Sequence, residues 1–243
     1  IPDSAKEALT KAQANGHLTF INTGRPLSIL PKEVMELPFD GYLCGCGSHI
    51  IVNDTVIFDQ ELTSGQCSDI LFRARKMSVP VILEGNQYCY IDSKGAIDPK
   101  LDANNHLLME EFPDSILDAA KCEQLSYSKF CAICQTREQL DEFLSPFCDF
   151  LEPIDRGSHF YEIVPAGFSK ASAIDTVLRY LDQPIDDCYA FGDSSNDLSM
   201  LNHVPYSIAM GNSDDVVLKA ASYVTTPVWR HGIYTAMKHF QLI

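Results

Sequence analysis

Apolar residues near the amino end of the chain recur at every third or fourth position, which predicts an amphipathic helix. Ser4 and Glu7 have the spacing of a capping box, and Asn15-Gly16 is typical of a helix end. The next apolar run, residues 17–22, predicts a short buried strand that leads into a polar turn. Further on, two short apolar runs within residues 49–58 predict a β-hairpin.

Between residues 62 and 165 the pattern becomes a mixture of hairpins and helices with exposed charge. We expect helices near 67–76, 115–121 and 138–144, and strands near 79–84, 87–91, 129–134, 150–154 and 159–164. Such a mixture predicts an inserted α+β domain over residues 62–165. On either side of it, residues 1–61 and 166–243 alternate helices with strands, which predicts an α/β core domain.

The stretch 189–201 carries the strongest chemical signal in the chain. Its apolar start breaks at Gly192 into Asp193-Ser-Ser-Asn196-Asp197 and then resumes with helical spacing. This is the profile of a buried strand that ends in a polar loop and a helix amino terminus. Ligands of open α/β sheets bind beyond the carboxyl ends of strands, so we expect Asp193 and Asp197 to face a crevice.

An all-oxygen group of carboxylates, amide and hydroxyls suits Mg²⁺ or Ca²⁺ better than zinc or copper. A calcium-binding helix-loop-helix is excluded, because Leu198 and Val204 stand where that loop needs glycine and glutamate. A simple helix cap is the alternative, but a cap needs one such residue and the loop has five. A magnesium or phosphate site is therefore the better interpretation.

Two other polar features suit an anion. Thr23 and Gly24 follow a predicted strand, where a hydroxyl and an unhindered amide could hold a phosphate oxygen, and Arg25 adds charge. A turn that needs glycine for backbone freedom is the alternative. Lys170 opens a strongly amphipathic helix, the unfavourable end for a cation, so it either holds an anion there or is an ordinary solvated lysine.

Composition narrows the class of protein. The chain has 243 residues, 46% of them hydrophobic, and a net charge of −15, which excludes nucleic acid and anionic membranes as favoured partners. No apolar run approaches the about 18 residues of a membrane span, and no signal segment opens the chain. Nine irregularly spaced cysteines predict free thiols, a reducing compartment and a cytoplasmic location. The pairs Cys44/Cys46 and Cys131/Cys134 lack the further ligands of a metal site.

Three segments together resemble a known family. Residues 20–26 (Phe-Ile-Asn-Thr-Gly-Arg-Pro), 162–174 and 191–197 look like the second, third and fourth motifs of the haloacid-dehalogenase-like phosphatases. The order and spacing are similar to those of the Cof-type branch, whose cap is inserted between the second and third motifs. The resemblance implies an α/β fold with a Rossmann-like core, a parallel sheet with helices on both faces, and an inserted, mobile α+β cap. We expect hinges near 61–62 and 165–167, where the chain would leave and re-enter the core.

The resemblance also implies an activity, the hydrolysis of small phosphorylated metabolites such as sugar phosphates through an aspartyl-phosphate. Thr23 and Gly24 would hold the phosphoryl oxygens, with Arg25 and Asn196 as further phosphate ligands. Lys170 would neutralise the nucleophile and the phosphate. This matches what phosphoryl transfer needs, which is positioning and compensation of charge.

The cofactor implied by the resemblance is Mg²⁺. Asp193 would bind the metal, Asn196 would order its surroundings, and Asp197 would support it directly or through another group. In this scheme Lys170, Asp193 and Thr23 are the catalytic residues. The substrate and the oligomeric state have no signal in the sequence.

The family's first motif, Asp-x-Asp-x-Thr at the end of the first strand, is absent from the sequence. It would supply the nucleophile, the general acid/base and a central strand of the sheet. We therefore expect that the numbering begins inside a longer protein and that the nucleophile lies upstream of Ile1. The alternative is a non-catalytic phosphate-binding or regulatory protein that lacks the nucleophile.

Overall fold

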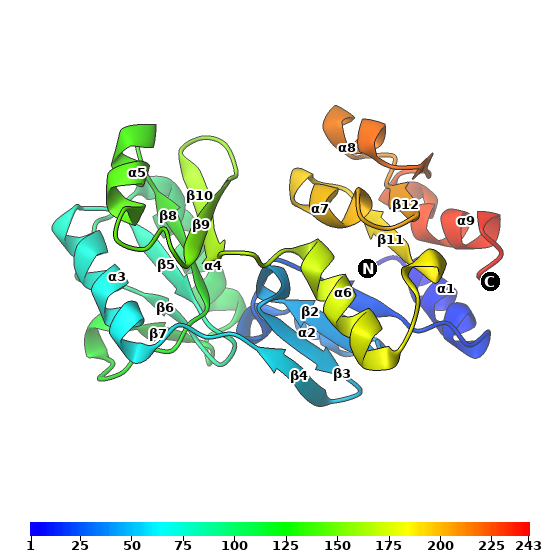
Figure 1. Ribbon diagram of the computed structural model, residues 1–243, viewed down its shortest axis with the longest axis horizontal. Helices are drawn as coiled ribbons and strands as arrows, with labels where there is room; N and C mark the ends of the chain where they lie inside the picture. The colour runs from blue at the N-terminus through cyan, green and yellow to red at the C-terminus, as the bar shows by residue number, and fades with distance from the viewer. The chain divides into compact units, whose positions relative to one another are not determined.

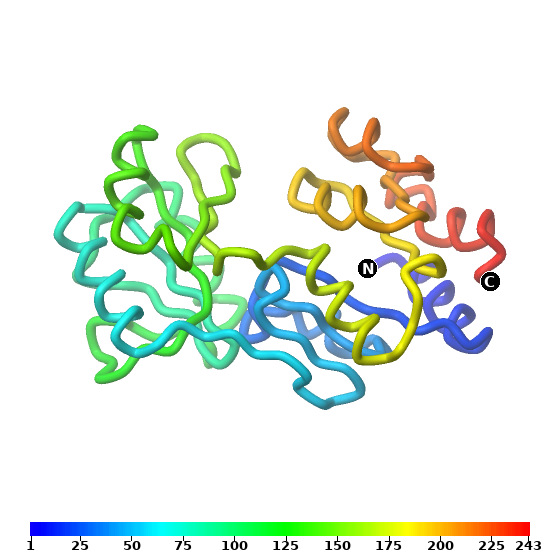
Figure 2. Tube along the Cα trace, viewed as in Figure 1, coloured from blue at the N-terminus to red at the C-terminus, as the bar shows by residue number.

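The computed structural model describes residues 1–243, which fold into two compact units (Figure 1). The core unit comprises Ile1–Gly24, Pro31–Phe58 and Ser169–Ile243. The inserted unit comprises Arg25–Leu30 and Asp59–Phe168. The chain passes into the long inserted segment after the hairpin at 49–59 and leaves it just before the helix at Lys170, a path that Figure 2 traces.

Short strands and helices alternate in the core unit. Its strands are β1 (Phe20–Asn22), β2 (Gly41–Cys44), β3 (His49–Val52), β4 (Thr55–Asp59), β11 (Tyr189–Gly192), β12 (Tyr206–Ala209) and β13 (Tyr223–Val224). Its helices are α1 (Asp3–Ala14), α2 (Lys32–Met35), α6 (Lys170–Leu181), α7 (Leu198–Leu201), α8 (Asp215–Ala220) and α9 (Gly232–His239). Short 3₁₀ turns lie at Gly45–Gly47, Ile185–Asp187, Ser195–Asp197 and Val228–Arg230.

The core strands form two sheets. One has the order β1-β2-β3-β4, with β1 parallel to β2 and the predicted hairpin at its far side. The other has the order β11-β12-β13 and is parallel throughout. Helix α6 packs on β2 and β3, α7 and α8 pack on β11 and β12, and α1 lies beside α9 in Figure 1. The parallel strands and covering helices confirm the predicted α/β class.

Strands β1 and β11 are each the last strand of their sheet, with one edge unpaired. All three residues of β1 are only half-buried, as are Tyr189 and Phe191 of β11. Strands of parallel sheets are normally covered on both faces and paired on both sides unless they lie at an edge. Each core sheet therefore has an open edge, at β1 or at β11, that could accept a further strand.

The inserted unit is built on a six-stranded sheet with the order β7-β6-β5-β8-β10-β9. Its strands are β5 (Val81–Glu84), β6 (Cys89–Ile91), β7 (Ile116–Asp118), β8 (Lys129–Ile133), β9 (Leu151–Asp155) and β10 (Phe160–Pro165). Its helices are α3 (Ser64–Lys76), α4 (Pro99–Glu111) and α5 (Arg137–Leu144), with 3₁₀ turns at Leu27–Ile29 and Ala119–Lys121. Helices α3 and α5 cover one face of the sheet, and α4 with the turn at Leu27–Ile29 covers part of the other.

Residues 25–30 differ from our expectation, since we placed them in the core domain. Ile29 is buried against the apolar face formed by Ile82 and Leu101 of the inserted unit. The Ser28 hydroxyl donates to the Gly85 carbonyl at 2.7 Å. Burial of an apolar side chain and a tertiary hydrogen bond outweigh the weak local signal of this segment.

Three local predictions were wrong. The expected helix near 115–121 is the edge strand β7 followed by a 3₁₀ turn, because pairing with β6 overrides a short helical pattern. Helix α4 was missed, although Asp98 caps it and Pro99 opens it, a known start signal. The capping box at Ser4 does not form, since α1 already begins at Asp3 after Pro2.

No helix of the protein has the length and apolar character needed to span a bilayer.

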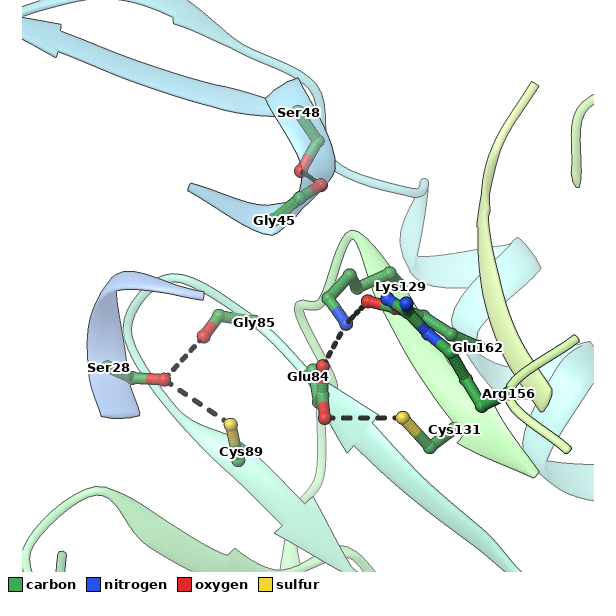
Figure 3. A network of polar contacts seen from close by, with 10 residues as sticks. All are labelled: Ser28, Gly45, Ser48, Glu84, Gly85, Cys89, Lys129, Cys131, Arg156 and Glu162. Carbon is green, nitrogen blue, oxygen red and sulfur yellow. Dashed lines mark hydrogen bonds and ion pairs between the residues drawn. The ribbon is translucent and has the colours of Figure 1, made fainter. Parts of the chain in front are cut away.

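A buried ionic network lies on the face of the inserted sheet opposite α3 and α5 (Figure 3). The Lys129 ammonium contacts both Glu84 and Glu162, and the Arg156 guanidinium also contacts Glu162. Burial alone would raise the pKa of Glu162, but the charges of Lys129 and Arg156 bring it down to about 2. Glu162 therefore stays ionised at neutral pH, and the network joins β5, β8 and β10 by ion pairs as well as by backbone hydrogen bonds.

Candidate active site

The carboxyl ends of β1 and β11 open into one cavity of about 410 Å³ in the core unit. Asn22 and Gly192, the last residues of these two strands, both line it. Its other polar lining residues are Lys170, Asp193, Ser194, Asn196, Asp197 and Asn212. Its apolar lining residues are Phe191, Met200, Met210, Val228 and Ile233. The structure thus brings together Lys170 and the 193–197 loop, which lie far apart in sequence.

Lys170 and Asp197 form a buried ion pair, with Nζ 2.5 Å from Oδ1 and both side chains 7% exposed. The other carboxylate oxygen of Asp197 accepts hydrogen bonds from the backbone amides of Asp193 at 2.9 Å and Ser194 at 3.1 Å. Both oxygens of Asp197 are therefore occupied by protein donors. Asp197 orders the loop and the lysine, and Lys170 is not the solvated lysine of the alternative interpretation.

The start of α6 is tightly specified. Ser169 caps the helix through a capping box with Ser172. The turn at Gly45–Gly47 packs directly beneath it: Gly47 has a φ of +93°, and a Cβ there would lie 2.6 Å from the Ser169 carbonyl oxygen. Only glycine satisfies both constraints. Lys170 is thus held at the cavity by its own helix cap and by the turn that follows β2.

Gly192 lets the 193–197 loop fold back on β11. A Cβ at this position would lie 2.6 Å from the Cβ of Asp197, too close for any side chain. The Asp193 side chain, in contrast, is exposed, and no protein group bonds its carboxylate. Asn196 lines the cavity and its amide oxygen accepts from the Ser194 hydroxyl. Asp193 is therefore the carboxylate that this loop leaves available to a ligand.

The other predicted phosphate residues divide between the units. Thr23 directly follows β1, and its amide donates to the Leu43 carbonyl at 2.8 Å, which extends the β1–β2 ladder by one residue. Neither Thr23 nor Gly24 is among the residues that line the cavity. Gly24 is the last residue of that stretch of the core unit. Arg25 belongs to the inserted unit, where Nη1 donates to the Ile29 carbonyl at 3.3 Å. Its predicted role in phosphate binding stays a prediction.

Sequence reasoning missed two cavity residues, Asn22 and Asn212. The Asn22 amide nitrogen donates to the Lys170 carbonyl at 2.8 Å. The Asn212 amide oxygen accepts from the Val228 amide at 2.9 Å and so links two loops of the cavity wall. Each lies at or just after the carboxyl end of a parallel strand, β1 or β12, which is the positional signal that could have found them.

The residues that line the cavity could supply part of the ligand set of a magnesium ion. No group of three or more His, Cys, Asp or Glu side chains of this chain could enclose a metal ion by itself. Mg²⁺, however, is commonly held by one or two carboxylates, with phosphate oxygens and water completing the shell. Asp193 provides one such carboxylate and Asn196 lies beside it on the same wall. The donor chemistry is all oxygen, as Mg²⁺ requires.

The protein thus combines an α/β core, with a cavity at the carboxyl ends of strands β1 and β11, and a separate α+β unit inserted in the chain. The family of haloacid dehalogenase-like hydrolases matches residues 1–237. The chain belongs to this family, so the resemblance inferred from three motifs is confirmed.

Individual relatives cover the chain almost end to end. The chain is 27% identical over 243 residues to the YkrA protein of Bacillus subtilis (strain 168). This alignment covers 100% of the chain and 92% of YkrA. An HMP-PP phosphatase of Yersinia enterocolitica is 31% identical over 215 residues, 85% of this chain and 76% of the relative. The solved structure of the HAD subclass IIB sugar phosphatase BT4131 superposes with a TM-score of 0.80 at 28% identity, over 100% of this chain and 93% of that one.

Proposed function

We propose that the protein is a Mg²⁺-dependent phosphatase that hydrolyses small phosphorylated metabolites, sugar phosphates or similar monoesters, through an aspartyl-phosphate. The observation that carries the proposal is that a buried lysine, Lys170, and an available carboxylate, Asp193, line the same cavity. The HMP-PP phosphatase and the sugar phosphatase among the similar proteins support this class of substrate.

Lys170 supplies the positive charge. An ammonium group has three hydrogen-bond donors, and Asp197 takes one of those of Lys170. The remaining donors can contact a phosphoryl oxygen and the attacking carboxylate. Because Asp197 holds the lysine in a buried position, the charge is oriented before the substrate binds, which is the most effective form of electrostatic stabilisation.

Asp193, with Asn196 beside it, would hold Mg²⁺, and the metal when bound compensates phosphate charge in the transition state. Asp197 contributes by fixing the backbone of the loop, since both of its oxygens are engaged. Thr23 and Gly24 would bind phosphoryl oxygens through a hydroxyl and an amide. Arg25 would add positive charge from the inserted unit, and movement of that unit would control access of water to the site.

The nucleophile is proposed to arrive on a strand between β1 and β11. Both strands end at the cavity, and each has an open edge on which a further strand can pair. A strand in that place would end at the cavity too, and would bring its terminal carboxylates next to Lys170 and Asp193. We infer that such a segment lies upstream of Ile1 in the full-length protein.

The test is hydrolysis of 4-nitrophenyl phosphate by the full-length protein with Mg²⁺ and with chelator. We expect activity only with Mg²⁺, and we expect Asp193→Asn to lower kcat/KM at least about 100-fold, as loss of one oriented electrostatic group does. Asp186→Asn is the matched control, because Asp186 is an exposed acid at the opposite end of β11. Full-length protein that binds inorganic phosphate but hydrolyses no ester would instead be the non-catalytic phosphate-binding protein.

A further inference from the structure

Asn22 lines the cavity, and none of the roles predicted for residues 20–26 falls on it. It is the last residue of β1, and its side chain reaches across to the first residue of α6, where Nδ2 lies 2.8 Å from the Lys170 carbonyl oxygen. The carbonyl can accept this bond in addition to the helical one, because it has two lone pairs. One side chain thus joins the strand that precedes Thr23 to the helix that carries Lys170.

The orientation of the Asn22 amide follows from this contact. A carbonyl group can only accept, so the amide nitrogen has to face Lys170 and the amide oxygen has to face away. That oxygen is buried and has no hydrogen-bond partner in the protein. Unsatisfied buried acceptors are rare, and they disfavour folding. Asn22 is therefore a poor choice for stability alone, while a residue of the same size without polar atoms would avoid the penalty.

We propose that Asn22 is a positioning residue for Lys170, one that holds the backbone of the lysine at the cavity at some cost in folding stability. The proposal rests on the proposed function, since it assigns Lys170 the binding of the phosphoryl group. The lysine is then fixed at both ends: the backbone by Asn22 and the ammonium by Asp197. Small displacements of such a group reduce turnover strongly, because the transition state tolerates little misalignment.

The first test is Asn22→Leu, which has nearly the same shape and lacks both polar atoms. We expect a thermal midpoint equal to or above that of the wild type, together with a roughly tenfold fall in kcat for an aryl phosphate and a smaller change in KM. A purely structural role for Asn22 predicts the reverse, a lower midpoint with unchanged kcat in the folded enzyme. That result would overturn the proposal.

Asn22→Asp gives a readout that depends on the proton. A protonated carboxylic acid can donate to the Lys170 carbonyl as the amide does, whereas a carboxylate cannot and is repelled by it. The kcat of the variant, relative to wild type, should therefore rise as the pH falls. The charged groups that line the same cavity are Lys170, Asp193 and Asp197, and they are present in both proteins, so the ratio isolates position 22. A ratio that does not change with pH contradicts the tether.

Asn15 offers a matched control. Its amide nitrogen donates to the Leu242 carbonyl at 3.0 Å, a bond of the same type in the same unit. Asn15→Asp should lower the thermal midpoint without changing kcat or its pH profile. If the wild type hydrolyses no ester, the proposed function fails, but the tether is still tested by amide hydrogen exchange. Asn22→Leu should speed exchange in residues 173–175, whose amides form the first hydrogen bonds of α6, and unchanged exchange there overturns the proposal.

Discussion

Replacement of Lys170 by methionine is the most informative single perturbation, because the structure predicts separate effects on stability and on activity. Methionine keeps the aliphatic length and removes the charge. Loss of an ordinary solvated lysine would change stability little, but the partner carboxylate of Asp197 is only 7% exposed and would stay charged without its cation. Breaking a buried pair costs about 3–5 kcal/mol, and the two backbone amides that still bond Asp197 favour the lower value, about 3 kcal/mol.

A loss of about 3 kcal/mol corresponds to a fall of roughly 6 to 12 °C in the thermal midpoint of a domain of this size. Turnover should fall by roughly 100-fold or more, since an oriented charge at the phosphoryl group is lost. The double variant Lys170→Met/Asp197→Asn separates the two effects. It removes the stranded charge, so it should regain most of the stability while kcat stays low.

Differential scanning calorimetry and steady-state kinetics on 4-nitrophenyl phosphate measure both effects on the same samples. Lys6→Met is the control, because Lys6 forms only a half-exposed pair with Glu33 at 3.7 Å and its loss should cost at most about 1 kcal/mol. The reasoning would be refuted if Lys170→Met melted like the wild type, or if the double variant recovered activity along with stability.

Two further predictions concern acid stability and the phosphoryl group. Because the pKa of Glu162 is depressed to about 2, its interactions with Lys129 and Arg156 stabilise the inserted unit fully above the ordinary carboxyl pKa. This stabilisation is lost as the pH falls towards 2. In thermal melts at acid pH, Glu162→Gln should flatten this pH dependence, whereas Glu152→Gln, at an exposed position of β9, should not. Thr23→Val should lower kcat/KM for every phosphate ester by a similar factor, because all esters share the phosphoryl group, and a panel in which some esters are spared would count against phosphate binding by Thr23.

Four of the residues singled out from the sequence line the cavity, namely Lys170, Asp193, Asn196 and Asp197, whereas Thr23, Gly24 and Arg25 do not. Lys170 and Asp193 were found because polar residues interrupt strong local patterns, and local patterns can be read from sequence. The ion pair between Lys170 and Asp197 spans 27 positions, and only the packing of α6 against the 193–197 loop brings the two together. That pairing also changes the expected role of Asp197, from a metal ligand towards an organiser of the loop.

The remaining errors have the same origin. Asn22 is one polar residue at the end of a short apolar run, and nothing near it in sequence indicates contact with a helix that begins at Lys170. The strand β7 exists because β6 offers it an edge, which a helical pattern in isolation does not reveal. Helix α4, in contrast, has a start signal in its sequence, since Asp98 caps the helix and Pro99 opens it.

The assignment of Arg25–Leu30 to the inserted unit has a mechanical consequence. The chain crosses between the units at four places, after Gly24, Leu30, Phe58 and Phe168. A unit joined to the rest of the chain by two connecting segments can rotate about many axes. Four connecting segments allow fewer rotations that leave all of them unstrained. One attachment follows Thr23 by a single residue, so any swing of the inserted unit pulls on the backbone that would hold the phosphoryl group. If the inserted unit moves as proposed, that motion and the binding of a phosphate group at Thr23 would be coupled through the covalent chain.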